Sequence, residues 1–270
     1  MTQSLPPAAL RLPKLSWRHG QTSDATRSIA EEMAVAITYN ELPYAVMMAS
    51  PLDLEDFATG FTLSEGFAER PSEIVSLATV VHERGAEMRL VLAREALERV
   101  LQRRRRVAGY TGCGVCGLES LEQAMRKLPS VRTGGRLSAE ALRAAFAGLA
   151  AAQPLNSETR AVHAAAYWEP EKGLCLLRED VGRHNALDKL IGALARADFD
   201  AAPGAVLLTS RISIELVQKA AVAGAAVLAA VSAPTALAVR AAEEAGITLV
   251  AIARGDGFGI FTHPQRIKFD

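Results

Sequence analysis

The sequence lacks a net charge and is poor in cysteine. Its 30 lysines and arginines balance 30 aspartates and glutamates. A general nucleic-acid binder usually carries a basic excess, so we expect no nucleic-acid partner. Three cysteines are too few for a disulfide framework, and two of them stand three positions apart, which favours a reducing compartment. Because 50% of the residues are hydrophobic and 22% are charged, the composition excludes a disordered chain.

No targeting or membrane-spanning segment is apparent in the sequence either. The first 20 residues are basic and interrupted by proline, without the apolar block of a signal peptide. The long uncharged stretch from Ala220 to Val239 is mostly alanine and valine, and Gly224 and Pro234 divide it into a helix end, a buried strand and a helix start. We therefore expect a soluble, cytoplasmic protein with no membrane partner.

The first 107 residues have the pattern of a small α+β domain. Residues 1–20 are expected to form a flexible tail, which leaves a domain over residues 21–107. Within it, the pattern predicts two strands in 29–50 that turn at Asn40-Glu41, a helix that begins at Pro51 or Leu52, and two strands in 74–93.

From about residue 108 to residue 270 the pattern is that of a larger α/β domain. A helix over 138–153, capped by Ser138, and a hairpin are followed by apolar runs that alternate with amphipathic helices. These runs are 174–178, 205–209, 226–231 and 247–253, and the helices between them begin near His184, Ser213 and Thr235. The alternation predicts a largely parallel sheet that helices cover on both faces.

Polar residues collect where these predicted strands end. They are Asp180 to Asn185, Ser210-Arg211, Ser232 and Arg254 to Gly257. In open α/β sheets, ligands bind beyond the carboxyl ends of the strands, where helix N-termini offer free N–H groups. The pattern therefore indicates a phosphate-bearing ligand, and the alternative is that these residues are ordinary caps and turns.

Cys113 and Cys116 are the most informative residues of the chain. They stand in Gly109-Tyr-Thr-Gly-Cys-Gly-Val-Cys-Gly117, where the glycines favour an exposed loop over a packed core. A helical pattern follows, and its N-terminus, together with the basic run Arg103 to Arg106, would lower the thiol pKa. These features suit a nucleophilic cysteine that carries a sulfur atom. The basic run could also dock a partner, steer an anion, or form a solvated helix face.

Two other uses of a cysteine pair fit the sequence less well. A structural zinc site wants four ligands, but the remaining cysteine, Cys175, lies in a predicted strand as a small core residue, and the five histidines are scattered. A zinc deaminase wants His-x-Glu, which does not occur, so no zinc is expected. A thioredoxin-like pair normally follows a buried strand, whereas a basic helical segment precedes this one.

Four segments in order resemble the FdhD family of sulfur carrier proteins, which formate dehydrogenase activity requires. They are Thr111–Gly117, Glu179–Gly192, Ser210–Ala220 and Val231–Ala238, and the resemblance runs from about residue 30 to the C-terminus. It implies a small N-terminal α+β domain and a three-layer main domain similar to the cytidine deaminase fold, without its zinc. The family's Thr-Gly-Gly-x-His is replaced here by Thr159-Arg-Ala-Val-His163.

The resemblance also implies a function. Proteins of this family take sulfur from a cysteine desulfurase and pass it to the molybdenum cofactor, in its bis(molybdopterin guanine dinucleotide) form, before the cofactor enters formate dehydrogenase. The persulfide would form on Cys113, and Cys116 would release or shelter the sulfur. A homodimer is expected as well. The alternative is a cofactor-binding chaperone in which sulfur transfer is incidental.

The family's cofactor-binding stretch corresponds to six consecutive residues: Ile252, Ala253, Arg254, Gly255, Asp256 and Gly257. Arg211 and Arg183 are further candidates for the diphosphates, because the guanidinium group matches phosphate oxygens. His184 is a candidate ligand contact, and a capping or core histidine is the alternative.

Overall fold

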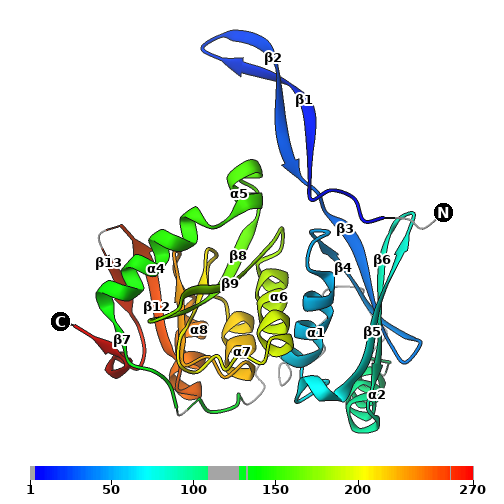
Figure 1. The fold of residues 1–270 in the computed structure, drawn as a ribbon, viewed down its shortest axis with the longest axis vertical. Coiled ribbons are helices and arrows are strands. Elements are labelled where there is room, and N and C mark those ends of the chain that lie inside the picture. Colours follow the sequence, from blue (N-terminus) through cyan, green and yellow to red (C-terminus); the bar gives the residue numbers. More distant parts are fainter. Residues whose placement is uncertain (1–3, 109–127, 132, 256, 270) are drawn as a thin grey trace.

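Two sheets with their helices lie side by side, and a long hairpin projects from them (Figure 1). The computed structural model describes residues 4–108, 128–131, 133–255 and 257–269. The α/β class expected from the sequence is confirmed. In the part of the chain that is described, no helix is both long and apolar enough to cross a membrane.

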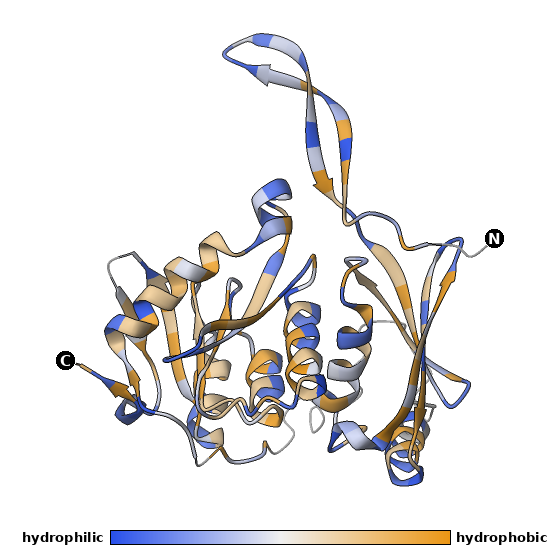
Figure 2. Cartoon of the chain, in the orientation of Figure 1, coloured by the Kyte–Doolittle hydropathy of each residue, from blue (hydrophilic) through white to orange (hydrophobic). Residues whose placement is uncertain are grey.

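The projecting hairpin consists of strands β1 (Ala9–Arg18) and β2 (Gln21–Ala30). His19 and Gly20 join them with positive φ angles of 51° and 81°, as a tight two-residue hairpin turn requires. The expectation of a flexible tail over residues 1–20 is therefore wrong for residues 9–18. Hydrophilic and hydrophobic residues mix along this ribbon (Figure 2), and most of them are exposed, so neither strand has a buried face.

The first sheet has four strands in the order β4-β3-β6-β5, with only β3 and β6 parallel. Helices α1 and α2 pack their apolar residues against one face of it. The predicted turn at Asn40-Glu41 is confirmed, with φ angles of 46° and 67°. The elements are β3 (Met33–Tyr39), β4 (Leu42–Ala49), α1 (Leu54–Ser64), β5 (Ile74–His82), β6 (Gly85–Leu92) and α2 (Arg94–Ala108).

The second sheet has six strands in the order β13-β12-β11-β10-β8-β9. Only β10, β11 and β12 pair in parallel, whereas β8 is antiparallel to both of its neighbours and β13 is antiparallel to β12. The expectation of a largely parallel sheet is therefore wrong, because a hairpin supplies each end of the sheet. The strands are β8 (His163–Glu169), β9 (Gly173–Asp180), β10 (Ala205–Leu208), β11 (Val227–Ala230), β12 (Thr248–Arg254) and β13 (Gly257–Ile260).

Helices cover both faces of this second sheet. Residues of α6, α7 and α8 form one core with one face, and α4 forms another core with the opposite face. The Ser138 hydroxyl caps α4 by accepting from Ala141 N at 3.3 Å, as predicted. The helices are α4 (Ala139–Ala151), α5 (Pro154–Thr159), α6 (Arg183–Arg196), α7 (Ile214–Val222) and α8 (Ala236–Ala245), and β7 (Leu137–Ser138) pairs with β14 (Ile267–Lys268).

Helix α1 of the first unit lies against helix α6 of the second (Figure 1). Their backbones touch at two glycines. A Cβ atom on Gly60 would lie 1.7 Å from Asp188 O, and one on Gly192 would lie 1.9 Å from Asp56 O. The two units are thus joined by direct contact between helix backbones, which only glycine allows at these positions.

Candidate functional site

Four strands of the second sheet end at one edge, which we call the carboxyl edge. Strand β9 is antiparallel to β8, and β8 is antiparallel to β10, so β9 runs in the same direction as β10, β11 and β12. The carboxyl edge therefore comprises the segments 180–185, 209–213, 231–235 and 252–257. His163 also lies here, paired with Asp180 at the start of β8. The topology thus brings the polar segments singled out in the sequence to one place.

Backbone hydrogen bonds hold three of these segments together. Ile212 N donates to Ala233 O at 3.2 Å, and Thr235 N donates to Ile212 O at 2.9 Å. Ile252 N in turn donates to Ser232 O at 3.2 Å. The loops after β10, β11 and β12 therefore form a continuous surface.

The helices that follow the strands present their N-termini at this edge. The Thr235 hydroxyl caps α8 by accepting from Ala238 N at 3.1 Å. By contrast, Gly182 and Ser213, the residues before α6 and α7, make no side-chain cap hydrogen bond. The Glu215 carboxylate accepts from a backbone N–H in the first turn of α7, whereas the first turn of α6 contains no acidic residue. The first-turn amides of α6 are therefore suited to an anionic ligand, because a helix N-terminus combines free N–H donors with a positive dipole end.

His184 lies in the first turn of α6 with a buried ring nitrogen. Its Nε2 atom has no hydrogen-bond partner within the described parts of the chain. Burial lowers the pKa of His184, and the Arg183 guanidinium lowers it further. Burial likewise lowers the pKa of His163, again with help from Arg183. Near neutral pH both rings are therefore uncharged, and His184 Nε2 can serve a ligand or a water molecule.

We expect the free energy of unfolding to fall as the pH drops through about 6.5. Histidine in the unfolded chain titrates near 6.5, whereas the folded chain lowers the pKa of His163 and His184. The unfolded state therefore binds protons first as the pH falls. This contribution to stability is complete above the unfolded pKa and is lost below it.

Denaturant unfolding at about pH 7.5 and about pH 5.5 measures this effect. A chain with both His163→Gln and His184→Gln should lose less stability between these two values. An equal loss in this variant and in the unaltered chain would contradict the assignment.

Strand β12 contains a strained residue near its C-terminal end. Ile252 has a φ of 57°, in the left-handed region that a β-branched side chain rarely adopts. Its side chain is 42% exposed, at an irregularity in the pairing of β12 with β13. Ala253 is buried, Arg254 and Gly255 are exposed, Gly257 is half-buried, and Asp256 lies outside the described residues.

Three arginines predicted to contact phosphate are found at the carboxyl edge. Arg211 and Arg254 are exposed, and Arg183 is half-buried beside the two histidines. The structure adds Arg143 of α4, which the sequence analysis missed. It donates from Nη1 to Gly255 O at 3.4 Å and pairs with Glu140. Its position in an ordinary amphipathic helix gave no signal in the sequence.

Cys113 and Cys116 lie outside the described residues, but both ends of their segment are placed. Helix α2 ends at Ala108, five residues before Cys113, so the two Cα atoms are at most about 18 Å apart. The chain is described again from Leu128, which packs against the core of the second unit and lines a cleft with Ile214 and Leu237 of α7 and α8. The segment therefore connects the first unit to the second.

The remaining thiol belongs to the sheet. Cys175 of β9 is half-buried, and its Sγ donates to Gly173 O at 3.5 Å. Burial raises the pKa of this thiol, which disfavours the reactive thiolate. Across the described ranges, no group of three or more His, Cys, Asp and Glu side chains is placed to hold a metal ion.

Much of the segment Glu179–Gly192 joins the two units. Asp180 and Lys189 form a fully buried ion pair with 2.7 Å between Oδ2 and Nζ. Asp180 Oδ2 also accepts from Ser50 N at 2.9 Å, and Lys189 Nζ donates to Ser50 O at 3.0 Å. The two side chains thus form hydrogen bonds with both the N–H and the C=O of Ser50, at the start of the connection from β4 to α1.

A second buried pair involves Asp188, the residue directly before Lys189. Asp188 of α6 contacts Lys219 of α7 at 2.9 Å and accepts from the Ser64 hydroxyl at 2.6 Å. The sequence analysis assigned no role to these charges. A signal was present, because Asp188 and Lys189 interrupt the apolar run Ala186–Leu194, and charged residues on a buried helix face are almost always paired.

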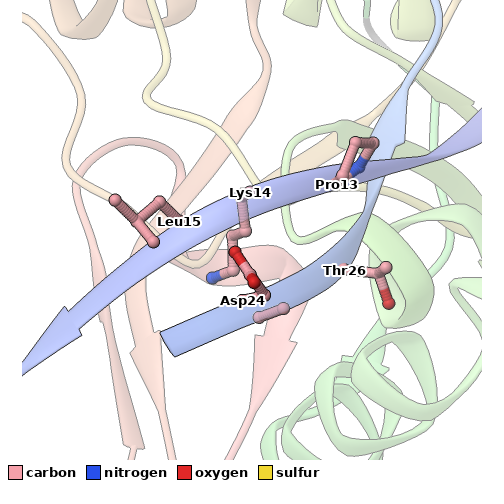
Figure 3. A pocket seen from close by; sticks show the side chains of 6 residues that line it. Pro13, Lys14, Leu15, Asp24 and Thr26 are labelled. Atoms are coloured by element: carbon pink, nitrogen blue, oxygen red, sulfur yellow. The ribbon is translucent and has the colours of Figure 1, made fainter. Parts of the chain in front are cut away.

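A separate hollow lies on the projecting hairpin (Figure 3). It is lined by Pro13, Lys14, Leu15, Asp24, Ala25 and Thr26. The hairpin extends away from both sheets (Figure 1), so this hollow is not part of the carboxyl edge. One lysine and one aspartate on a two-stranded ribbon provide no converging set of polar groups, and the carboxyl edge remains the candidate site.

Comparison with known proteins identifies the family. The model of the FdhD/NarQ family matches residues 30–268. The sulfur carrier protein FdhD of Cupriavidus necator is 48% identical over 265 residues, which cover 98% of this chain and 92% of the relative. The protein of that name from Agrobacterium fabrum is 47% identical over 258 residues, covering 95% of each chain.

A solved structure shares the fold. It is the crystal structure of a protein from Desulfotalea psychrophila assigned as a formate dehydrogenase accessory protein. The match has a TM-score of 0.78 at 24% sequence identity and covers 97% of this chain and 100% of that one. The resemblance seen in the four sequence segments is thus confirmed, and the chain belongs to the FdhD/NarQ family.

Proposed function

We propose that this protein carries sulfur from a cysteine desulfurase to the molybdenum cofactor, in its bis(molybdopterin guanine dinucleotide) form, before the cofactor enters formate dehydrogenase. The observation that carries the proposal is the 48% identity, over 98% of the chain, to a sulfur carrier protein. The family resemblance further leads us to propose this cofactor as the sulfur acceptor, a cysteine desulfurase as the donor, a cytoplasmic location and a homodimer.

Cys113 is proposed to hold the sulfur. Its thiolate attacks the outer sulfur of a persulfide on the desulfurase. The desulfurase cysteine leaves as a thiolate, and the outer sulfur stays on Cys113 as a new persulfide. An acceptor that supplies an electron pair can then attack the outer sulfur directly; the S–S bond breaks, and Cys113 leaves as a thiolate. Alternatively, the Cys116 thiolate attacks Cys113 Sγ, expels hydrosulfide and forms a disulfide that a cellular dithiol must reduce.

The carboxyl edge is proposed to bind the cofactor as a substrate. Arg183, Arg211 and Arg254 would contact its diphosphates, together with the first-turn amides of α6. Gly255 and Gly257 would let backbone N–H groups approach the anion, and the unpartnered Nε2 atom of His184 would make a neutral hydrogen bond. These groups support binding of an anionic ligand at the carboxyl edge.

Mass spectrometry of the intact protein and its peptides tests the carrier role. After incubation with cysteine and an active desulfurase, we expect the Cys113 peptide to gain one sulfur. The gain should be lost on reduction and absent from Cys113→Ala. No gain, with the desulfurase shown to be active in the same tube, would contradict the proposal.

A cofactor-binding chaperone is the second candidate function. It is favoured by the carboxyl edge, whose arginines and helix N-termini can bind an anion without either cysteine. A double variant, Cys113→Ala with Cys116→Ala, separates the two functions. If this variant still supports an active formate dehydrogenase, the chaperone function is correct and sulfur transfer is incidental.

A further inference from the structure

Glu65 connects two helices that belong to different units. It follows the last residue of α1, and its carboxylate accepts from Arg103 Nη2 of α2 at 3.1 Å and from Lys219 Nζ of α7 at 3.3 Å. Arg103 Nη1 also donates to the Glu65 carbonyl oxygen at 3.1 Å. We call Arg103, Glu65 and Lys219 the Glu65 bridge.

On the side of the second unit, the Glu65 bridge leads toward the carboxyl edge. Lys219 is buried and pairs with Asp188 of α6 through both carboxylate oxygens, at 2.9 and 3.0 Å. Asp188 is one helical turn from His184, and the charges of Lys219 and Glu65 both influence the pKa of that ring. Since Asp188 holds Lys219 independently of Glu65, loss of the Glu65 carboxylate would leave Lys219 paired.

On the side of the first unit, the bridge leads toward the cysteine segment. Arg103 lies near the end of α2, ten residues before Cys113, and its guanidinium also covers the Phe67 ring at 5.5 Å. The side chain of Arg103 is only 24% exposed. The alternative of a solvated face is therefore wrong for this member of the basic run.

A second arginine anchors α2 without touching the bridge. Arg99 Nε donates to Phe67 O at 2.9 Å, and its guanidinium pairs with Glu73. Its side chain is 29% exposed, close to the value for Arg103. The same helix thus offers two similar arginines, of which only one contacts Glu65.

We propose that Glu65 is a positioning residue that acts through Arg103 and Lys219: it orients the end of α2, from which the cysteine segment begins, relative to the carboxyl edge. The inference rests on the proposed sulfur transfer. The bridge acts on delivery of sulfur to the cofactor, and loading by the desulfurase does not depend on it. A partly exposed ion pair contributes little to stability, whereas misplacement of reacting groups by about 1 Å can slow a reaction about 100-fold.

Two matched variants of the full-length protein test this inference, Arg103→Met and Arg99→Met. For each, mass spectrometry measures the rate of sulfur loading on Cys113, and guanosine diphosphate serves as a binding probe for the carboxyl edge. Activation is measured as the formate dehydrogenase activity of cells that lack their own carrier and are supplied with the variant. For Arg103→Met we expect loading and probe binding close to those of the unaltered protein, with activation lowered about tenfold or more. Arg99→Met should lower activation less than twofold.

Glu65→Gln provides an independent arm of the test. It should lower activation as Arg103→Met does, and the loss in the double variant should be smaller than the two losses combined, because both changes break the pair between Glu65 and Arg103. Additive losses would overturn the inference, as would unchanged activation in Arg103→Met, an equal loss in Arg99→Met, or slower loading in Arg103→Met. If the unaltered protein takes up no sulfur, the proposed function fails, and the inference fails with it.

Discussion

Replacement of Cys113 by alanine is expected to abolish activation of formate dehydrogenase, by a factor on the order of 10³ or more. The variant lacks the sulfur atom on which the proposed persulfide forms, and Cys175, the one cysteine among the described residues, cannot replace it. Cys175 is held in β9 with a raised pKa. The measurement is formate dehydrogenase activity in cells whose own carrier has been deleted, with the variant supplied at the level of the unaltered protein.

Cys175→Ala is the matched control for this experiment. It removes a half-buried thiol that packs against the core, so activation should stay close to that of the unaltered protein. Circular dichroism of both variants checks that the fold is intact. Full activation by the Cys113→Ala variant would overturn the carrier function and favour the chaperone.

Replacement of Gly60 by alanine is expected to destabilise the protein by about 3 kcal/mol or more. The new Cβ atom would lie 1.7 Å from Asp188 O and 2.6 Å from Gly192 N, and backbone atoms cannot move aside as a flexible side chain can. The higher helix propensity of alanine favours the variant by only about 1 kcal/mol, so the clash between α1 and α6 dominates. Denaturant unfolding measures the difference.

Gly148→Ala separates the clash from the propensity effect. Gly148 lies within α4, and a Cβ atom there would meet nothing within 4 Å. This change should stabilise the protein by about 0.5–1 kcal/mol. If Gly60→Ala is also stabilising, the two helices are not in contact as described.

Regular alternation made most elements of this fold predictable from the sequence. The strands on both sides of Asn40-Glu41 and the helix capped by Ser138 are where the pattern indicates. The predicted start of α1 was less accurate. The helix begins at Leu54, after Asp53 with a φ of 52°, and not at Pro51 or Leu52. Local periodicity does not report such a left-handed residue.

Strand direction and interactions between the units could not be predicted from the sequence. The continuous apolar run of β8 has the same pattern whether the strand is parallel or antiparallel to β10. The approach of Gly60 to Gly192 depends on the packing of two helices that are far apart in the chain. At the candidate site, the polar residues at the strand ends were predictable from the sequence. The contact of Arg143 with Gly255 and the strained backbone of Ile252 were not, because both depend on tertiary contacts.

The Asp180–Lys189 and Asp188–Lys219 pairs restrict the motion of the two units. A slide of α1 along α6 would take Ser50 and Ser64 away from these charges, and a buried polar group that loses its hydrogen bond costs about 1–3 kcal/mol. Opening between the units would expose the same charges and separate the contact at Gly60 and Gly192. We therefore expect the two units to move together, so that a ligand reaches the carboxyl edge without any hinge opening between them.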